Sequence, residues 1–197
     1  MPLFTLVAGA RPNFMKIAPL VHAIQKKQRE GVAVDFRLVH TGQHYDKNMS
    51  GDFFEQLHIP APHANLGGGG GTQAEQTAAI LVAFEQELMA HRPDLVLVVG
   101  DVTSTLACSI SAKKLQIDVA HVEAGIRSGD LSMPEEINRI DTDKITDHFF
   151  VTEQSGLDNL TAERGSNNNV FFVGNTMIDT MVAFEKEIEN SGIFIIL

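Results

Sequence analysis

Three carboxylate side chains stand where they could transfer protons. Asp101 follows the apolar run Leu95–Val99, Glu123 follows a second apolar run at residues 119–122, and Glu135 lies in a segment with a helical pattern. Carboxylates act as general acids or bases when their surroundings set different pKa values for them. These residue types therefore indicate acid–base chemistry.

Arg11 could hold an anion next to these carboxylates. It follows the apolar run Leu3–Ala8, which reads as the first strand. In an open parallel sheet, ligands bind beyond the carboxyl ends of the strands, at the point where the strand order reverses. We expect this point to lie between the first strand and Leu95–Val99, so Arg11 and Asp101 should line one crevice.

Each of these residues also has an ordinary explanation. Arg11 could be solvated or paired with a surface acid, and Asp101 could cap the helix that follows it. Glu135 and Glu136 could be the acidic residues that favour the first turn of a helix. Glu123 is harder to explain in this way, because it enters an Ala-Gly turn where no helix needs a cap. These alternatives stay open on position alone.

Motifs for other chemistries are missing from the sequence. It contains neither of the glycine-rich phosphate motifs G-x-G-x-x-G and G-x-x-x-x-G-K-[ST], and five consecutive glycines at residues 67–71 read as a flexible linker. Histidine, cysteine and aspartate have no zinc-ligand spacing, so no metal is expected. Cys108 lies within a predicted helix and is no candidate nucleophile. His44 and His121 are more typical of hydrogen-bonded structural histidines.

Strand-like and helical segments alternate along the chain. The apolar runs predict strands at Leu3–Ala8, 34–40, Leu95–Val99, 119–122, 149–151 and 170–173. Helical patterns fall at residues 13–28, 48–57, 72–90, from about 102 to 114, 134–146, 154–163 and 176–189. Thr72 is the expected N-cap of the third helix, with Glu75 completing a capping box. This alternation predicts an α/β fold, with helices on a doubly wound parallel sheet.

Composition narrows the class of protein. A chain of 197 residues suits one α/β domain, and its net charge of −10 disfavours nucleic acid as a partner. With one cysteine, the chain cannot form an internal disulfide. No apolar run is long enough to span a membrane, and the first residues lack the pattern of a signal peptide. We therefore expect a cytoplasmic protein with no membrane partner.

Six ordered motifs give the chain a resemblance to a known family. They are GARP at residues 9–12, TGQHYD at 41–46, VGDVTST at 99–105, HVEAGIRSGD at 121–130, MPEEINR at 133–139 and VGNT at 173–176. In this order and spacing they resemble UDP-N-acetylglucosamine 2-epimerases. The motifs that contain the three carboxylates carry most of the likeness, which extends from residue 9 to about residue 181.

The resemblance implies an architecture and an activity. Members of the family have two Rossmann-like domains in the glycosyltransferase-B arrangement, with the active site between them. They interconvert UDP-N-acetylglucosamine and UDP-N-acetylmannosamine without a redox cofactor, and they form homodimers. By resemblance, Asp101, Glu123 and Glu135 occupy the catalytic carboxylate positions, and Arg11 contacts the phosphates of the UDP-sugar. The resemblance further implies a substrate-binding or UDP-binding role for Lys16, Gln43, His44, Glu136 and Arg139.

The motifs favour the non-hydrolysing branch of the family and leave alternatives open. Gln43 and Glu136 also match positions of a regulatory substrate site in some bacterial members. The glycines at 67–71 stand where those members have an arginine, which argues against such regulation here. A hydrolysing 2-epimerase, a non-catalytic fragment and a glycosyltransferase of the same architecture remain the alternatives.

The resemblance also predicts the domain organisation. The family has a His-Arg motif at the start of its second domain, and none follows in this sequence. We expect residues 1–190 to form the N-terminal Rossmann-like domain. Residues 191–197 would be a linker or the first strand of a missing C-terminal nucleotide-binding domain. The chain would then supply the carboxylate half of an active site and be inactive alone.

Overall fold

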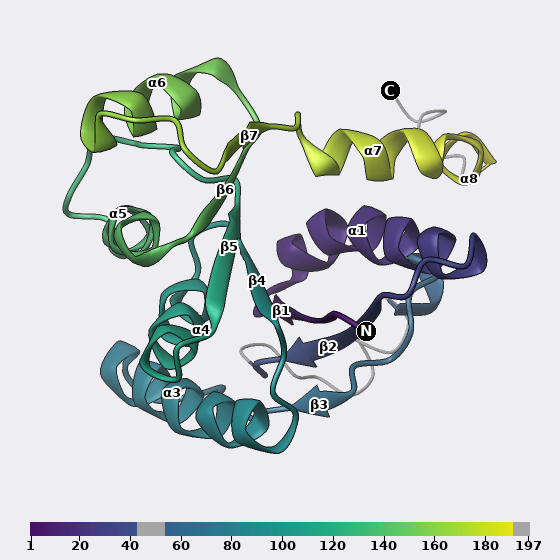
Figure 1. Ribbon diagram of the computed structural model, residues 1–197, viewed down its shortest axis with the longest axis horizontal. Helices are drawn as coiled ribbons and strands as arrows, with labels where there is room; N and C mark the ends of the chain where they lie inside the picture. Colours follow the sequence, from purple (N-terminus) through teal and green to yellow (C-terminus); the bar gives the residue numbers. More distant parts are fainter. Residues whose placement is uncertain (43–53, 191–197) are drawn as a thin grey trace.

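A parallel β-sheet forms the centre of the protein. The computed structural model describes residues 1–42 and 54–190, and in this part the strand order is β3-β2-β1-β4-β5-β6-β7, with every pair parallel (Figure 1). The strands are β1 (Leu3–Ala8), β2 (Asp35–His40), β3 (Ala64–Asn65), β4 (Leu95–Val99), β5 (Asp118–Val122), β6 (His148–Val151) and β7 (Val170–Phe172). The order reverses between β1 and β4, as in the doubly wound Rossmann arrangement. This confirms the predicted fold class and the predicted switch point.

Helices cover both faces of this sheet (Figure 1). On one face lie α1 (Arg11–Arg29) and α7 (Thr176–Ala183), which run side by side and are joined where Thr180 Oγ1 donates to Met15 O at 2.6 Å. The other face carries α3 (Gln73–Ala90), α4 (Thr103–Lys114), α5 (Pro134–Ile145) and α6 (Gln154–Arg164). The chain continues from α7 into α8 (Glu185–Asn190).

Alternate residues of the strands build the two halves of the core. In β1, Leu6 and Ala8 pack with the α1 side, whereas Val7 packs with α3 and α4 on the opposite side. Successive side chains of a strand point to opposite faces, so a strand covered on both faces must be apolar throughout. The run Leu95–Val99 meets this requirement, because Val96, Val98 and Val99 are buried.

Most predicted elements are confirmed to within one or two residues. The capping box at the start of α3 is present, with Glu75 N donating to Thr72 Oγ1 at 3.3 Å and Thr72 N to Glu75 Oε2 at 2.7 Å. One strand was missed and one prediction is wrong. The short strand β3 was not expected, and the helix predicted at 176–189 is interrupted at Phe184. The helix predicted at 48–57 lies mostly, and the segment 191–197 wholly, outside the described residues.

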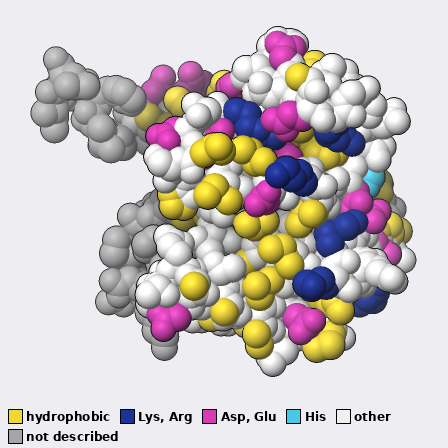
Figure 2. All heavy atoms as spheres, turned by 90° about the vertical axis from the view of Figure 1, so that its left-hand side faces the viewer, with side chains coloured by type: hydrophobic (Ala, Val, Ile, Leu, Met, Phe, Trp, Pro, Cys, Tyr) yellow, Lys and Arg dark blue, Asp and Glu magenta, His cyan; other side chains and the backbone are white. Residues whose placement is uncertain are grey.

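The outer face over α3 to α6 mixes apolar and charged side chains. Figure 2 shows apolar side chains gathered down this face, with basic and acidic ones between them. Val82 and Met89 on α3 and Ile137 on α5 are among the exposed apolar residues. None of the described helices is long and apolar enough to cross a membrane.

Candidate functional site

Asn13 lies at the switch point of the sheet, in the first turn of α1. Its Oδ1 accepts hydrogen bonds from the backbone N–H groups of Gly9 at 3.1 Å and Ala10 at 2.9 Å. Its Nδ2 donates to the carbonyl of Val99 at 3.2 Å. The buried Asn13 thus ties the loop after β1 to the end of β4. Sequence reasoning missed this residue, although its place in the first turn of a helix is one from which a side chain reaches back to the N-cap.

Glu123 follows directly after the end of β5. Its Oε2 lies 2.5 Å from Lys16 Nζ, and the two side chains are only 12% and 14% exposed. Its φ of 70° is in the left-handed region, which residues other than glycine rarely adopt. The turn at Gly100 comes close to it, because a Cβ at Gly100 would lie 3.5 Å from Glu123 Oε2. The backbone therefore directs this carboxylate to the turn that precedes Asp101.

Asp101 faces the start of α5. Its carboxylate is hydrogen-bonded and ion-paired to Arg139, and its carbonyl accepts a bond of 2.9 Å from Asn138 Nδ2. The alternative of a helix cap is wrong, because the N-cap of α4 is Val102. With its side chain 26% exposed, Asp101 is accessible as well as fixed in place.

Glu135 lies in the first turn of α5 and is exposed. No described residue forms a hydrogen bond or an ion pair with its carboxylate. Residues three and four positions apart lie on the same side of a helix, so Glu135 shares a side with Asn138 and Arg139, which contact Asp101. The geometry thus places Glu135 one helical turn from the groups that hold Asp101.

Glu136, the next residue, points inward and holds a loop. Its side chain is 1% exposed and accepts hydrogen bonds from the backbone N–H groups of Ser128 and Gly129, each at 2.9 Å, and from Arg139 at 3.2 Å. Burial raises the pKa of this carboxyl group, but these hydrogen bonds outweigh it and lower the pKa to about 2. Glu136 is therefore a fixed negative charge that also orients Arg139.

His121 is buried beneath these turns. Its Nδ1 lies 2.7 Å from Asp143 Oδ1 and its Nε2 lies 2.8 Å from the carbonyl oxygen of Gly100. The expectation of a hydrogen-bonded histidine is confirmed. Asp143, which the sequence did not single out, also accepts from Gly125 N at 3.0 Å and from Arg127 at 2.8 Å.

Three predicted site residues cannot be placed. Gln43 and His44 lie outside the described residues, and the side chain of Arg11 is not described, although its backbone begins α1. Their roles stay predictions. Of the other predicted residues, the structure joins Lys16 to Glu123 and Arg139 to both Asp101 and Glu136. No group of metal-ligating side chains occurs in the described part of the chain.

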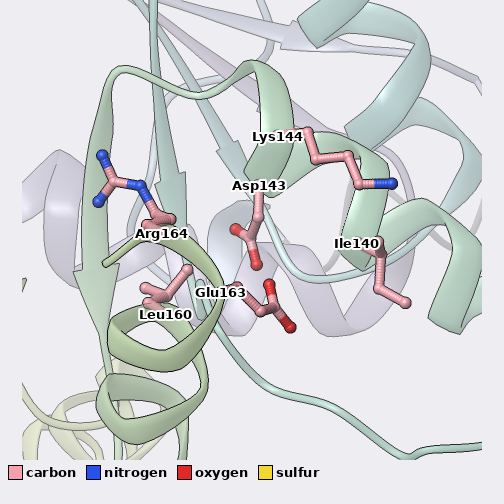
Figure 3. A pocket seen from close by; sticks show the side chains of 6 residues that line it. All are labelled: Ile140, Asp143, Lys144, Leu160, Glu163 and Arg164. Atoms are coloured by element: carbon pink, nitrogen blue, oxygen red, sulfur yellow. The ribbon is translucent and has the colours of Figure 1, made fainter. Parts of the chain in front are cut away.

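A cavity of about 320 Å³ opens elsewhere, between α5 and α6. Figure 3 shows its six lining residues, which are Ile140, Asp143, Lys144, Leu160, Glu163 and Arg164. Arg127, which is not among them, bonds the carboxylates of both Asp143 and Glu163. Both acids of the cavity are therefore already paired within the protein, and the cavity contains none of the predicted site residues. The strand ends around Gly100, where the predicted residues Asp101 and Glu123 lie, are the stronger candidate.

Fold and site together define a class of protein. The chain is a Rossmann-like α/β domain with carboxylates at the switch point of its sheet, of the type found in the glycosyltransferase-B architecture. A galactosyltransferase of the lipopolysaccharide outer core shares this fold at 14% identity and a TM-score of 0.63.

Comparison with known proteins gives the family. The profile of the UDP-N-acetylglucosamine 2-epimerase family matches residues 25–194, and the chain belongs to this family. It is 43% identical over 175 residues to the UDP-N-acetylglucosamine 2-epimerase of Methanocaldococcus jannaschii, covering 89% of this chain and 46% of that protein. A UDP-2,3-diacetamido-2,3-dideoxy-D-glucuronate 2-epimerase of Pseudomonas aeruginosa is 41% identical over 188 residues, covering 94% of this chain and 52% of that protein.

Solved structures agree with this assignment. The crystal structure of the Methanocaldococcus jannaschii enzyme in complex with UDP-GlcNAc and UDP matches with a TM-score of 0.89 at 42% identity, covering 96% of this chain and 51% of that one. The Neisseria meningitidis enzyme bound to UDP-GlcNAc matches with a TM-score of 0.86 at 30% identity, covering 96% of this chain and 50% of that one. The chain spans about half the length of the relatives it matches.

Proposed function

We propose that this chain supplies the carboxylate half of an active site that interconverts UDP-N-acetylglucosamine and UDP-N-acetylmannosamine. The observation that carries the proposal is that Asp101 follows Gly100 directly and that the Glu123 carboxylate lies close to Gly100, at the switch point of the sheet. Membership of the epimerase family supports the substrate class, since two structural relatives hold UDP-GlcNAc.

The reaction explains why several carboxylates are needed. The hydrogen on C2 of the sugar is not next to a carbonyl, so its direct removal as a proton would be very slow. When the bond between C1 and the UDP oxygen breaks, positive character at C1 acidifies this hydrogen. Elimination of UDP then gives a 2-acetamidoglucal, and UDP adds back while a proton reaches C2 from the opposite face. This sequence needs a base, an acid and a group that stabilises the cationic sugar.

The surroundings of the three carboxylates suit different roles. Asp101 and Glu135 are the proposed proton-transfer pair. Asp101 is partly exposed beside Arg139, and Glu135 is exposed on the side of α5 that carries Arg139. Glu123 is the proposed stabiliser of the sugar cation, because it is more buried and is held by Lys16. Different environments allow neighbouring carboxylates to differ in protonation.

The remaining predicted residues would hold the substrate. Arg11 is the proposed contact of the diphosphate, whose departure a guanidinium stabilises. Lys16 and Arg139 bind the substrate beside the carboxylates that they already contact. Gln43, His44 and Glu136 complete the proposed list of binding residues.

The complete enzyme needs further parts. We propose that a C-terminal nucleotide-binding domain provides the opposite wall of the site, and that the chain is inactive without it.

The exposed apolar side chains over α3 and α5 support a further proposal, that the protein pairs as a homodimer through this face (Figure 2). Sedimentation of the two-domain protein would test the dimer. We also propose a cytoplasmic location, which cell fractionation would test.

The amide variants Asp101→Asn, Glu123→Gln and Glu135→Gln, made in the two-domain protein, test the assignment. Entry of solvent deuterium at C2 of UDP-N-acetylglucosamine should be reduced in each variant. Glu85→Gln changes an exposed acid on α3 and serves as the matched control. Unchanged deuterium entry in all three site variants would refute the proposed site.

Product analysis separates the competing functions. The non-hydrolysing reaction conserves the UDP-sugar, whereas a hydrolysing epimerase releases UDP and free N-acetylmannosamine. The substrates should include UDP-2,3-diacetamido-2,3-dideoxy-D-glucuronate, because a relative named for that sugar is 41% identical. A non-catalytic fragment predicts no turnover and only weak UDP binding by residues 1–197 alone.

A further inference from the structure

The ring of His121 faces a hydrogen-bond acceptor on each side. The carbonyl oxygen of Gly100, 2.8 Å from Nε2, can only accept. Asp143, 2.7 Å from Nδ1, accepts hydrogen bonds from Gly125 N and Arg127 as well. A backbone N–H and a guanidinium at these distances favour the charged form of the Asp143 carboxyl group, whatever the protonation of the histidine. The Asp143 carboxylate is therefore ionised, and it too only accepts.

This geometry determines the protonation of the ring. A neutral imidazole has one N–H donor and one acceptor nitrogen, so one of its nitrogens would face an oxygen lone pair with no hydrogen between them. His121 is 0% exposed, and no water could relieve that contact without entering the core. A ring that carries hydrogen on both nitrogens satisfies both oxygens.

The surrounding charges balance a protonated ring. Arg127 donates to Asp143 and also to Glu163 on α6, at 2.8 Å and 2.7 Å. Figure 3 shows the Asp143 and Glu163 side chains pointing toward one another, and Arg127 bridges them. Two positive and two negative groups thus form one neutral network, which spans β5, the turn after it, α5 and α6.

The position of the ring relates this network to the proposed catalytic groups. His121 lies on β5 two residues before Glu123, and it holds the carbonyl of the residue before Asp101. We propose that His121, doubly protonated and held by Asp143, is a positioning residue that fixes the turn carrying Asp101 relative to the turn carrying Glu123. The effect of His121 on catalysis rests on the proposed function. The charge of its ring and its hydrogen bond to Gly100 do not depend on that function.

Two variants of His121 separate the two contacts. The amide of Gln places a donor near the Nε2 position, and the shorter amide of Asn places one near the Nδ1 position. His121→Gln should therefore keep the bond to Gly100, and His121→Asn should keep the bond to Asp143.

Nuclear magnetic resonance of residues 1–197 tests directly the charge of the His121 ring and its hydrogen bond to Gly100. In the wild type, both ring nitrogens of His121 should show attached hydrogens and imidazolium shifts at pH 7. The amide signals of Gly100 and Asp101 should stay near their wild-type positions in His121→Gln and move in His121→Asn. A neutral ring, or equal changes in both variants, would overturn the proposal, and neither result depends on activity.

Kinetics of the two-domain enzyme test the catalytic consequence. Displacement of a catalytic group by about 1 Å can cost on the order of 100-fold in rate. We expect His121→Asn to lower kcat by roughly this factor with little change in KM, and His121→Gln to lower it several-fold less. Equal kcat losses in both variants would indicate a merely structural histidine. A wild-type enzyme that does not epimerise, together with the expected resonances, would refute the function and leave the positioning intact.

Discussion

Replacing Glu136 by Gln should destabilise the domain in a strongly pH-dependent way. The carboxylate accepts three hydrogen bonds, from Ser128 N, Gly129 N and Arg139. An amide has one acceptor oxygen, and its NH₂ group would face a backbone N–H donor. The variant thus loses the charge and leaves at least one buried donor without a partner.

The magnitude follows from the pKa of Glu136, which is lowered from 4.5 to about 2. A difference of this size corresponds to at most about 3.4 kcal/mol of stability, at about 1.36 kcal/mol per pKa unit. Because the folded pKa lies below the unfolded one, this stability is fully present above pH 4.5 and is lost as the pH falls toward 2. Linkage gives a loss of roughly 1.4 kcal/mol by pH 3.5.

Urea unfolding of residues 1–197 at pH 7 and pH 3.5 measures this contribution. We expect Glu136→Gln to cost about 2–3 kcal/mol at pH 7 and about 1.4 kcal/mol less at pH 3.5. Glu135→Gln is the matched control, because the neighbouring carboxylate is exposed and has no described partner, and it should change stability by less than about 0.5 kcal/mol. A penalty for Glu136→Gln that is the same at both pH values would refute the reasoning.

Further substitutions test the packing and the ion pair of the site. Gly125→Ala should cost about 2–5 kcal/mol in urea unfolding, because strain at positive φ adds to a clash, and its Cβ would lie 2.2 Å from Gly156 O. Gly129 has a similar φ, but the space around it is open, so Gly129→Ala should cost only about 1–2 kcal/mol. If both variants lost the same stability, the close contact between Gly125 and Gly156 would not be the cause. Lys16→Met should cost about 1–3 kcal/mol by leaving Glu123 without its cation. Part of that loss should be recovered in the double variant with Glu123→Gln, and strictly additive losses would argue against the ion pair.

The fold could be predicted from the sequence because its signals are local. The apolar run Leu95–Val99 is short and bounded, and the segment at Thr72 and Glu75 has the chemistry of a helix start. The interruption at Phe184 and the strand Ala64–Asn65 could not be predicted in this way. A two-residue strand has no periodicity to detect, and it forms because β2 offers a free edge beside it.

The site was predicted less completely, because its contacts join residues far apart in the chain. Asp101 could be assigned to the site because it follows the end of a strand. Its pairing with Arg139 could not be predicted, because it depends on how α5 packs. His121 was expected to be hydrogen-bonded, yet nothing local indicated Asp143, which is 22 residues away. Strand ends can therefore be located from sequence, whereas the partners that set the charge of a side chain depend on tertiary packing.

The ion pairs at the strand ends are unfavourable for binding a nucleotide. Lys16 and Arg139 are already engaged with Glu123 and Asp101, so these pairs bring no net positive charge to a ligand. A diphosphate would therefore gain little attraction from these pairs on a chain of net charge −10. These pairs thus disfavour a nucleotide, and we infer that the proposed C-terminal domain would contribute the groups that bind UDP.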